Sequence, residues 1–146
     1  MKFFKESENI EFHWYVNDDS KNEIASHNKE LNSIFHSIVE REEALKLMAG
    51  SFHCLVSIGN LNTTQIPSKV IEYISTGKPV IHFCEVENDP VKNIANEFQN
   101  LFIISETSNK ENLLNQLNSF YKDISTFNKE LFIEKYTSNS ITEILN

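Results

Sequence analysis

Short apolar segments alternate along this chain with segments whose apolar residues recur at helical spacing. The apolar segments are rich in β-branched and aromatic residues, so they predict strands at residues 10–16, 33–39, 52–59, 78–84 and 101–106. The segments between and after them predict helices at residues 21–32, 40–51, 67–76, 89–98, 109–124 and 127–145. This alternation is typical of an α/β fold. We therefore expect one Rossmann-like domain over residues 1–146, with a parallel sheet of about five strands and helices on both faces.

Residues with special backbone preferences support two of these helices. Pro67 stands in the first turn of the helix predicted at residues 67–76, and Gly77 comes just past its end. Asp89 is suited to cap the helix that follows, with Pro90 at the first helical position. The first of these helices is therefore predicted to run from Pro67 to just before Gly77, and the second to begin at Pro90.

The composition excludes several classes of partner. The formal net charge is -8, whereas binding to the phosphates of nucleic acids or to an anionic membrane needs an excess of Lys and Arg. No apolar run is long enough to span a bilayer, and the start, MKFFKESENIEF, lacks an apolar stretch of signal-peptide length. We therefore expect a cytoplasmic protein without a transmembrane segment.

The usual sequence signs of metal or nucleophilic chemistry are missing. No H-x-x-x-H pair, G-x-S-x-G elbow, G-x-G-x-x-G turn or P-loop is found, and no Cys–His cluster is expected. Cys54 and Cys84 both lie in apolar runs and are interpreted as buried free thiols. Glu85 and Glu87 follow the strand predicted at residues 78–84 and are expected to face solvent. The sequence therefore predicts no bound metal and no cofactor.

A polar loop follows the strand predicted at residues 52–59. It contains Asn60, Asn62, Thr63, Thr64 and Gln65, and it leads to a helix N-terminus that carries Ser68 and Lys69. Ligands of open α/β sheets bind beyond the carboxyl ends of the strands, and helix N-termini attract anions. The loop is therefore a candidate binding site for an anionic ligand. The alternative is a solvated turn with capping residues.

Glu72 is the one acidic residue in the otherwise largely apolar helix after this loop. Val70, Ile71 and Ile74 can share the buried face of that helix without Glu72 entering the core. Because helical side chains lean toward the N-terminus, the carboxylate could reach back to the ligand and accept hydrogen bonds from ribose hydroxyls. Alternatively, Glu72 faces solvent near Lys69. The pattern alone favours the solvent-facing interpretation.

The segments EALKLMAGSFHCLVSIGN and QIPSKVIEYISTGKPVIHF together resemble part of a known family. They are similar to the C-terminal, donor-binding domain of GT-B fold glycosyltransferases of the E-x7-E type, which is close to family 4. The most specific match is PSKVIEYISTGKPV, residues 67–80. The resemblance implies a hexosyltransferase that uses a nucleotide-sugar, without a metal or cofactor, to build a glycan or polysaccharide precursor.

The resemblance also implies roles for particular residues. Glu72 matches the second Glu of the motif, which holds the donor ribose, whereas Thr64 stands at the position of the first Glu. Ile38 and Val39 would lie near the base. The donor sugar and phosphates would be lined by Asn60, Thr64, Gln65, Ile66, Pro67, Ser68 and Lys69.

Other features depart from the family. The sequence begins at what resembles the second strand of such a domain, and residues 17–20, NDDS, replace the Gly that usually closes this strand. By this resemblance, we expect the sequence to lack the first strand with its Gly-rich turn and the acceptor-binding N-terminal domain. We therefore expect a donor-binding half whose missing N-terminal part is supplied by a partner chain or domain. The alternative is a non-catalytic Rossmann-like interaction module, or a truncated fragment, that docks on such a partner.

Overall fold

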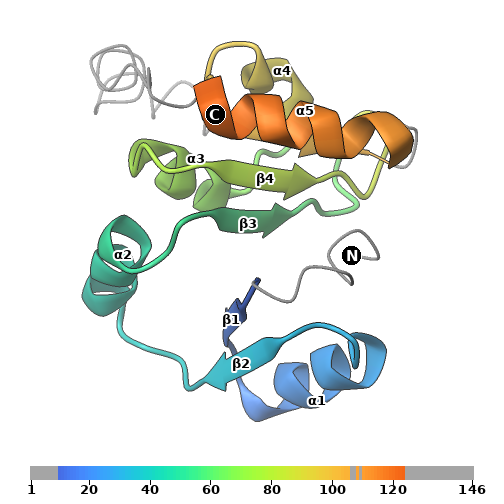
Figure 1. Ribbon diagram of the computed structural model, residues 1–146. Coiled ribbons are helices and arrows are strands. Elements are labelled where there is room, and N and C mark those ends of the chain that lie inside the picture. Colours follow the sequence, from blue (N-terminus) through green and yellow to red (C-terminus); the bar gives the residue numbers. More distant parts are fainter. Residues whose placement is uncertain (1–9, 106–107, 109, 124–146) are drawn as a thin grey trace. The chain divides into compact units, whose positions relative to one another are not determined.

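The computed structural model describes residues 10–105, 108 and 110–123. Strands and helices alternate along them, as predicted (Figure 1). The elements are β1 (Phe12–Tyr15), α1 (Asp18–His27), β2 (Ser33–His36), α2 (Arg41–Gly50), β3 (Leu55–Ile58), α3 (Ser68–Ser75), β4 (Val80–Phe83), α4 (Val91–Ala95), β5 (Leu101–Ile104) and α5 (Lys110–Asp123). The helix predicted at residues 127–145 lies outside the described residues. Within the described residues, no helix is long and apolar enough to cross a membrane.

The strands form two small parallel sheets, which corrects the prediction of one sheet of about five strands. β1 pairs with β2, and β3, β4 and β5 pair in that order. The chain accordingly divides into two compact units, Met1–Lys46 and Leu47–Asn146. The prediction erred because hydrophobic periodicity identifies strands but carries no information on which strands become neighbours.

In the first unit, α1 connects the two parallel strands. It begins at Asp18, earlier than the predicted residue 21, because Asn17 caps it: the Asn17 Oδ1 accepts a hydrogen bond from the Ser20 amide at 2.8 Å. Asp18 and Asp19 then lie in the first turn, where the helix dipole favours acidic residues. The NDDS segment is therefore the start of α1.

In the second unit, one face of the sheet is covered by α3 and α4. Leu55, Val80 and Leu101 are register partners on adjacent strands, so their side chains share this face. They belong to one buried cluster with Val70 and Ile74 of α3, Val91 and Ile94 of α4, and Phe98, which follows α4. This cluster is the hydrophobic core of the second unit.

The helix α5 supplies apolar contacts of its own to the second unit. Phe102 of β5 packs against Phe120 of α5 with ring centroids 5.2 Å apart. Phe102 lies next to Leu101 in the strand, and successive side chains of a strand point to opposite faces, so α5 contacts the face opposite the core cluster. Leu113 and Leu117 of α5 are buried.

The junction between α3 and β4 matches the sequence prediction closely. Gly77 has a φ of 73°, the left-handed conformation that Gly adopts readily after a helix, and its amide donates to the Ile74 carbonyl. The buried Asn100 side chain donates to the Ile74 and Lys78 carbonyls at 3.1 and 2.9 Å. These bonds fix the turn that leads α3 into β4.

Candidate functional site

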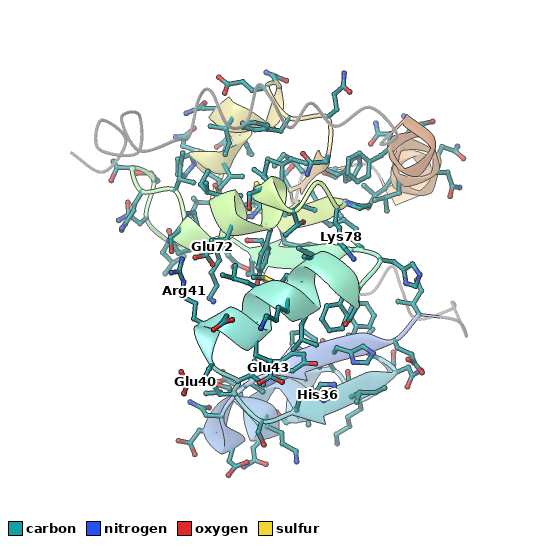
Figure 2. The ribbon with its side chains drawn as sticks, turned by 90° about the vertical axis from the view of Figure 1, so that its left-hand side faces the viewer. His36, Glu40, Arg41, Glu43, Glu72 and Lys78 are labelled. Atoms are coloured by element: carbon teal, nitrogen blue, oxygen red, sulfur yellow. The ribbon has the colours of Figure 1, made fainter. Side chains whose placement is uncertain are left out.

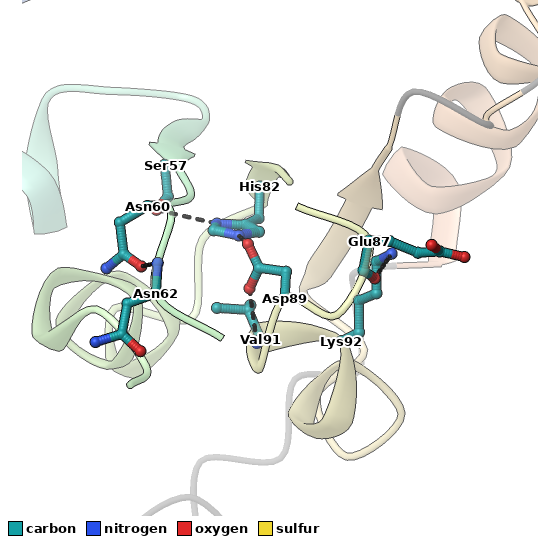
Figure 3. A network of polar contacts seen from close by, with 8 residues as sticks. All are labelled: Ser57, Asn60, Asn62, His82, Glu87, Asp89, Val91 and Lys92. Carbon is teal, nitrogen blue, oxygen red and sulfur yellow. Dashed lines mark hydrogen bonds and ion pairs between the residues drawn. The ribbon is translucent and has the colours of Figure 1, made fainter. Parts of the chain in front are cut away.

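A buried network of polar side chains lies at the carboxyl ends of β3 and β4 (Figure 3). Ser57 and His82 are register partners in the parallel sheet, so their side chains lie side by side on one face. The Ser57 Oγ and the His82 Nδ1 are 3.1 Å apart. Parallel pairing of β3 and β4 thus brings together two residues that are 25 positions apart in the sequence.

Asp89 completes this network from the segment between β4 and α4. Its Oδ2 lies 3.1 Å from the His82 Nε2, and its Oδ1 accepts a hydrogen bond from the Val91 amide at 2.9 Å. The exposed fractions of Ser57, His82 and Asp89 are 6%, 0% and 3%. The Asp89 side chain therefore bonds the amide of the first residue of α4. The predicted N-cap and first helical residue are each one position too early, because Pro90 precedes the helix and Val91 begins it.

Gly59, just after β3, has no side chain, and the Asp89 carboxylate occupies the space where one would lie. A Cβ atom built on Gly59 would collide with the Asp89 Oδ2 and would lie 3.2 Å from the Phe83 carbonyl oxygen. The Gly59 amide also donates to that carbonyl at 2.7 Å. The backbone of the β3 loop therefore packs directly against the buried carboxylate.

Cys84 adds a sulfur atom to the same site. It follows His82 by two residues, and one ligand atom from each of Cys84, His82 and Asp89 lies within 4.8 Å of the others. Burial, and next the nearby Asp89 charge, raise the pKa of the Cys84 thiol to about 11, and Lys92 opposes this shift weakly. The expectation that no Cys–His cluster forms was therefore wrong. The H-x-C spacing in a strand was the signal for it, because residues i and i+2 share a face.

The Ser57–His82–Asp89 arrangement does not suit nucleophilic catalysis. It contains the residue types of a hydrolase triad, but all three side chains are buried, so a substrate carbonyl cannot reach the Ser57 Oγ without local opening. In addition, Ser57 contacts Nδ1 and Asp89 contacts Nε2, the reverse of the order used by serine proteases. We interpret these contacts as a way to satisfy buried polar groups.

The predicted polar loop follows β3 and is held in shape by its own side chains. The Asn60 Oδ1 accepts a hydrogen bond from the Asn62 amide, and the Asn62 Oδ1 accepts from the Thr64 amide and hydroxyl, all at 2.8 Å. Residues 60–65 are exposed, including Thr63 and Gln65. The loop is therefore a pre-shaped polar surface at the carboxyl end of a parallel strand.

The residues that lead from this loop into α3 divide into two groups. Ile66 is half-buried and packs against the core cluster, and the half-buried Pro67 is the residue that precedes the helix. Ser68 and Lys69 form the exposed first turn of α3. The loop and the first turn of α3 therefore expose polar groups to solvent, whereas Ile66 packs against the core.

Glu72 is half-buried on α3. Its charge contributes, after burial, to a raised pKa of the neighbouring Tyr73. Figure 2 shows Glu72 and Lys78 apart, and the Lys78 ammonium instead donates to the Phe52 carbonyl. Glu72 therefore lies on the helix that follows the polar loop.

The other residues singled out in the sequence are not part of the polar loop or of α3. Val39 belongs to the first unit, and β2 ends at His36, so Val39 and the exposed Ile38 follow the strand instead of forming its end. Glu85 and Glu87 are exposed, as expected. Of the two thiols, Cys84 is buried as predicted, whereas Cys54 is half-buried, and both are free.

Comparisons with known proteins assign no family to the chain. No protein-family model, no curated protein and no solved structure matches the chain.

Proposed function

We propose that this chain is the donor-binding half of a glycosyltransferase and holds a nucleotide-sugar at the carboxyl end of β3. The observation that carries the proposal is the segment of residues 59–72, in which an exposed polar loop joins the end of a parallel strand to a helix bearing Glu72. In open α/β sheets this is where nucleotides bind. The similarity of residues 67–80 to the donor-binding motif of GT-B enzymes gives the ligand its class.

The diphosphate would lie against the loop and the first turn of α3. Amide groups at a helix N-terminus are unpaired within the helix and favour anions, and Ser68 and Lys69 add a hydroxyl and a positive charge there. The Asn60 and Asn62 side chains fold the loop before any ligand arrives. Less conformational entropy would then be lost on binding.

The ribose would be bound by Glu72. A carboxylate accepts hydrogen bonds from two neighbouring hydroxyl groups, and a position on α3 keeps it on a rigid element. Transfer of the sugar also requires an acceptor and positive charge against the leaving diphosphate. We assign those tasks to a partner chain or domain, with Lys69 as the contribution of this chain.

A second candidate, a non-catalytic interaction module, is favoured by one observation at the same loop. Ile58 and Leu61 lie on either side of Gly59 and Asn60 in the sequence and are 51% and 81% exposed. Exposed large apolar side chains at the tip of a sheet suit contact with another protein surface. In this case residues 58–61 would bind a partner chain and the loop would hold no nucleotide.

Calorimetric titration with uridine and guanosine diphosphates separates the two candidates. We expect at least one nucleotide to bind and Glu72→Ala to weaken binding about tenfold, the loss that corresponds to one hydrogen bond to a charged group. Glu85→Ala is the matched control, because Glu85 is an exposed acid that follows β4. Absence of binding by both nucleotides, or equal weakening by the two variants, would refute the donor site and leave the interaction module.

A further inference from the structure

The buried cluster beside Gly59 has the composition of a metal site. His82 and Cys84 project from the same face at the end of β4, and Asp89 faces them from the segment before α4. They offer an imidazole nitrogen, a sulfur and a carboxylate oxygen, all within 4.8 Å of one another. These three donor types are the ones that zinc accepts in proteins.

The groups around these three side chains are arranged as in the outer shell of a metal site. The Ser57 Oγ can accept a hydrogen bond from the His82 Nδ1, 3.1 Å away, which would leave Nε2 free to bind a metal. The Asp89 Oδ1 already accepts from the Val91 amide, so Oδ2, which faces the His82 Nε2 at 3.1 Å, is the oxygen that would bind the metal in place of this contact. Outer-shell bonds of this kind hold the ligands of bound metals in the right tautomer and orientation.

We propose that His82, Cys84 and Asp89 form a zinc site that joins the end of β4 to the start of α4. A thiolate sulfur selects against Mg²⁺ and Ca²⁺, which prefer oxygen ligands, and an imidazole–thiolate–carboxylate set suits Zn²⁺. The ion would take a fourth ligand from water or another donor, as in zinc sites with three protein ligands.

The charges are compatible with this assignment. Asp89 is 3% exposed, and its two oxygens face the Val91 amide and the His82 ring, so the carboxylate is compensated before any metal binds. A zinc ion would bind Asp89 directly and displace the thiol proton of Cys84, which leaves as H⁺ to the solvent. The ligand atoms need to close up by about 1 Å to reach zinc–ligand bond lengths. Rotation of the Cys84 side chain is the simplest movement that supplies this change.

The proposed zinc site and the proposed nucleotide site use different side chains. Its ligands are residues 82, 84 and 89, whereas the donor-binding residues lie in the loop and on α3. Failure of one proposal therefore leaves the other standing.

Titration of the metal-free full chain with Co²⁺ tests the proposal, because cobalt bound by a thiolate absorbs in the near ultraviolet. We expect one Co²⁺ per chain with this band, displaced by Zn²⁺. Cys84→Ser should abolish the band, and Cys54→Ser, the matched control at the other free thiol, should retain it. Ser57→Ala should weaken binding about tenfold, the loss typical of an outer-shell bond.

Two further controls apply to the Co²⁺ titration. Metal held by the exposed His13–His36 pair, whose ring nitrogens are 2.9 Å apart, would give no thiolate band. If Cys84→Ser fails to fold by circular dichroism, Asp89→Asn serves instead and should lower affinity at least tenfold. A folded wild-type chain without the band overturns the zinc site, and so does a band that survives in folded Cys84→Ser.

Discussion

The two units of this chain bury their sheets to very different extents. In the second unit, Val70, Ile74, Val80 and Val91 are fully buried around the three-stranded sheet. Among the described residues of the first unit, Leu31 is the one buried hydrophobic residue, and α1 buries none. Because hydrophobic stabilisation scales with apolar area removed from water, we infer that most of the folding free energy lies in the second unit.

The histidines show the same contrast. His82 in the second unit is fully buried, with a fixed partner on each ring nitrogen. In the first unit, His13 and His36 stack with ring centroids 5.2 Å apart, and Tyr15 stacks on His36 at 4.5 Å. The carboxyl end of the larger sheet therefore holds a buried polar group, whereas the histidines of the first unit lie at the surface.

The largest expected effect comes from opening the core of the second unit. Ile74→Ala should lower the free energy of unfolding by about 3 kcal/mol, because it removes a fully buried side chain and leaves a cavity. Ile24→Ala in α1 is the matched change, since Ile24 is half-buried and should cost about 1 kcal/mol. Urea denaturation followed by circular dichroism measures both. Equal losses would show that the two units do not differ as described.

A smaller loss is expected where the β3 loop meets Asp89. Gly59→Ala should cost about 2 kcal/mol, because the added methyl group collides with a buried carboxylate and with backbone. Gly50→Ala is the control: its Cβ would meet nothing within 4 Å, so we expect unchanged stability or a gain of up to about 1 kcal/mol. The same denaturation experiment compares them. A neutral Gly59→Ala would show that the loop moves freely away from Asp89.

The smallest effect is expected at the cap of α1. Asn17→Ala removes the acceptor of the Ser20 amide and should destabilise α1 by about 1 kcal/mol. Trp14, the single tryptophan, lies in the preceding strand and reports locally on the first unit through its fluorescence. Asn17→Ser, which keeps a capping oxygen, should restore most of the loss. Equal stability of the two variants would contradict the cap.

Much of the local structure could be predicted from the sequence. The helix of residues 68–75, the left-handed Gly77 and the strand of residues 80–83 follow from Pro67, Gly77 and a β-branched run, because these signals act over a few residues. The start of α1 was missed, although Asn17 followed by two acids is a recognisable helix start. Local chemistry therefore determined the elements, and errors fell mainly on their ends.

The candidate site was harder to predict because its parts come from distant positions. The polar loop could be identified, since residues 60–65 are contiguous. The contact of Ser57 with His82 depends on the register between β3 and β4, and Asp89 joins them only through the path of the backbone after β4. The division into two sheets likewise depends on strand neighbours, which no periodicity encodes.

The most direct test of the central claim, that residues 59–72 bind a nucleotide, is a map of amide chemical shifts. In the ¹⁵N-labelled chain, saturating nucleoside diphosphate should shift the amides of the β3–α3 loop and the first turns of α3 most strongly. Glu72→Ala should reduce the affinity measured from the same shifts. If the amides of residues 59–72 stay unchanged at millimolar concentrations of both uridine and guanosine diphosphate, the donor-binding account is wrong.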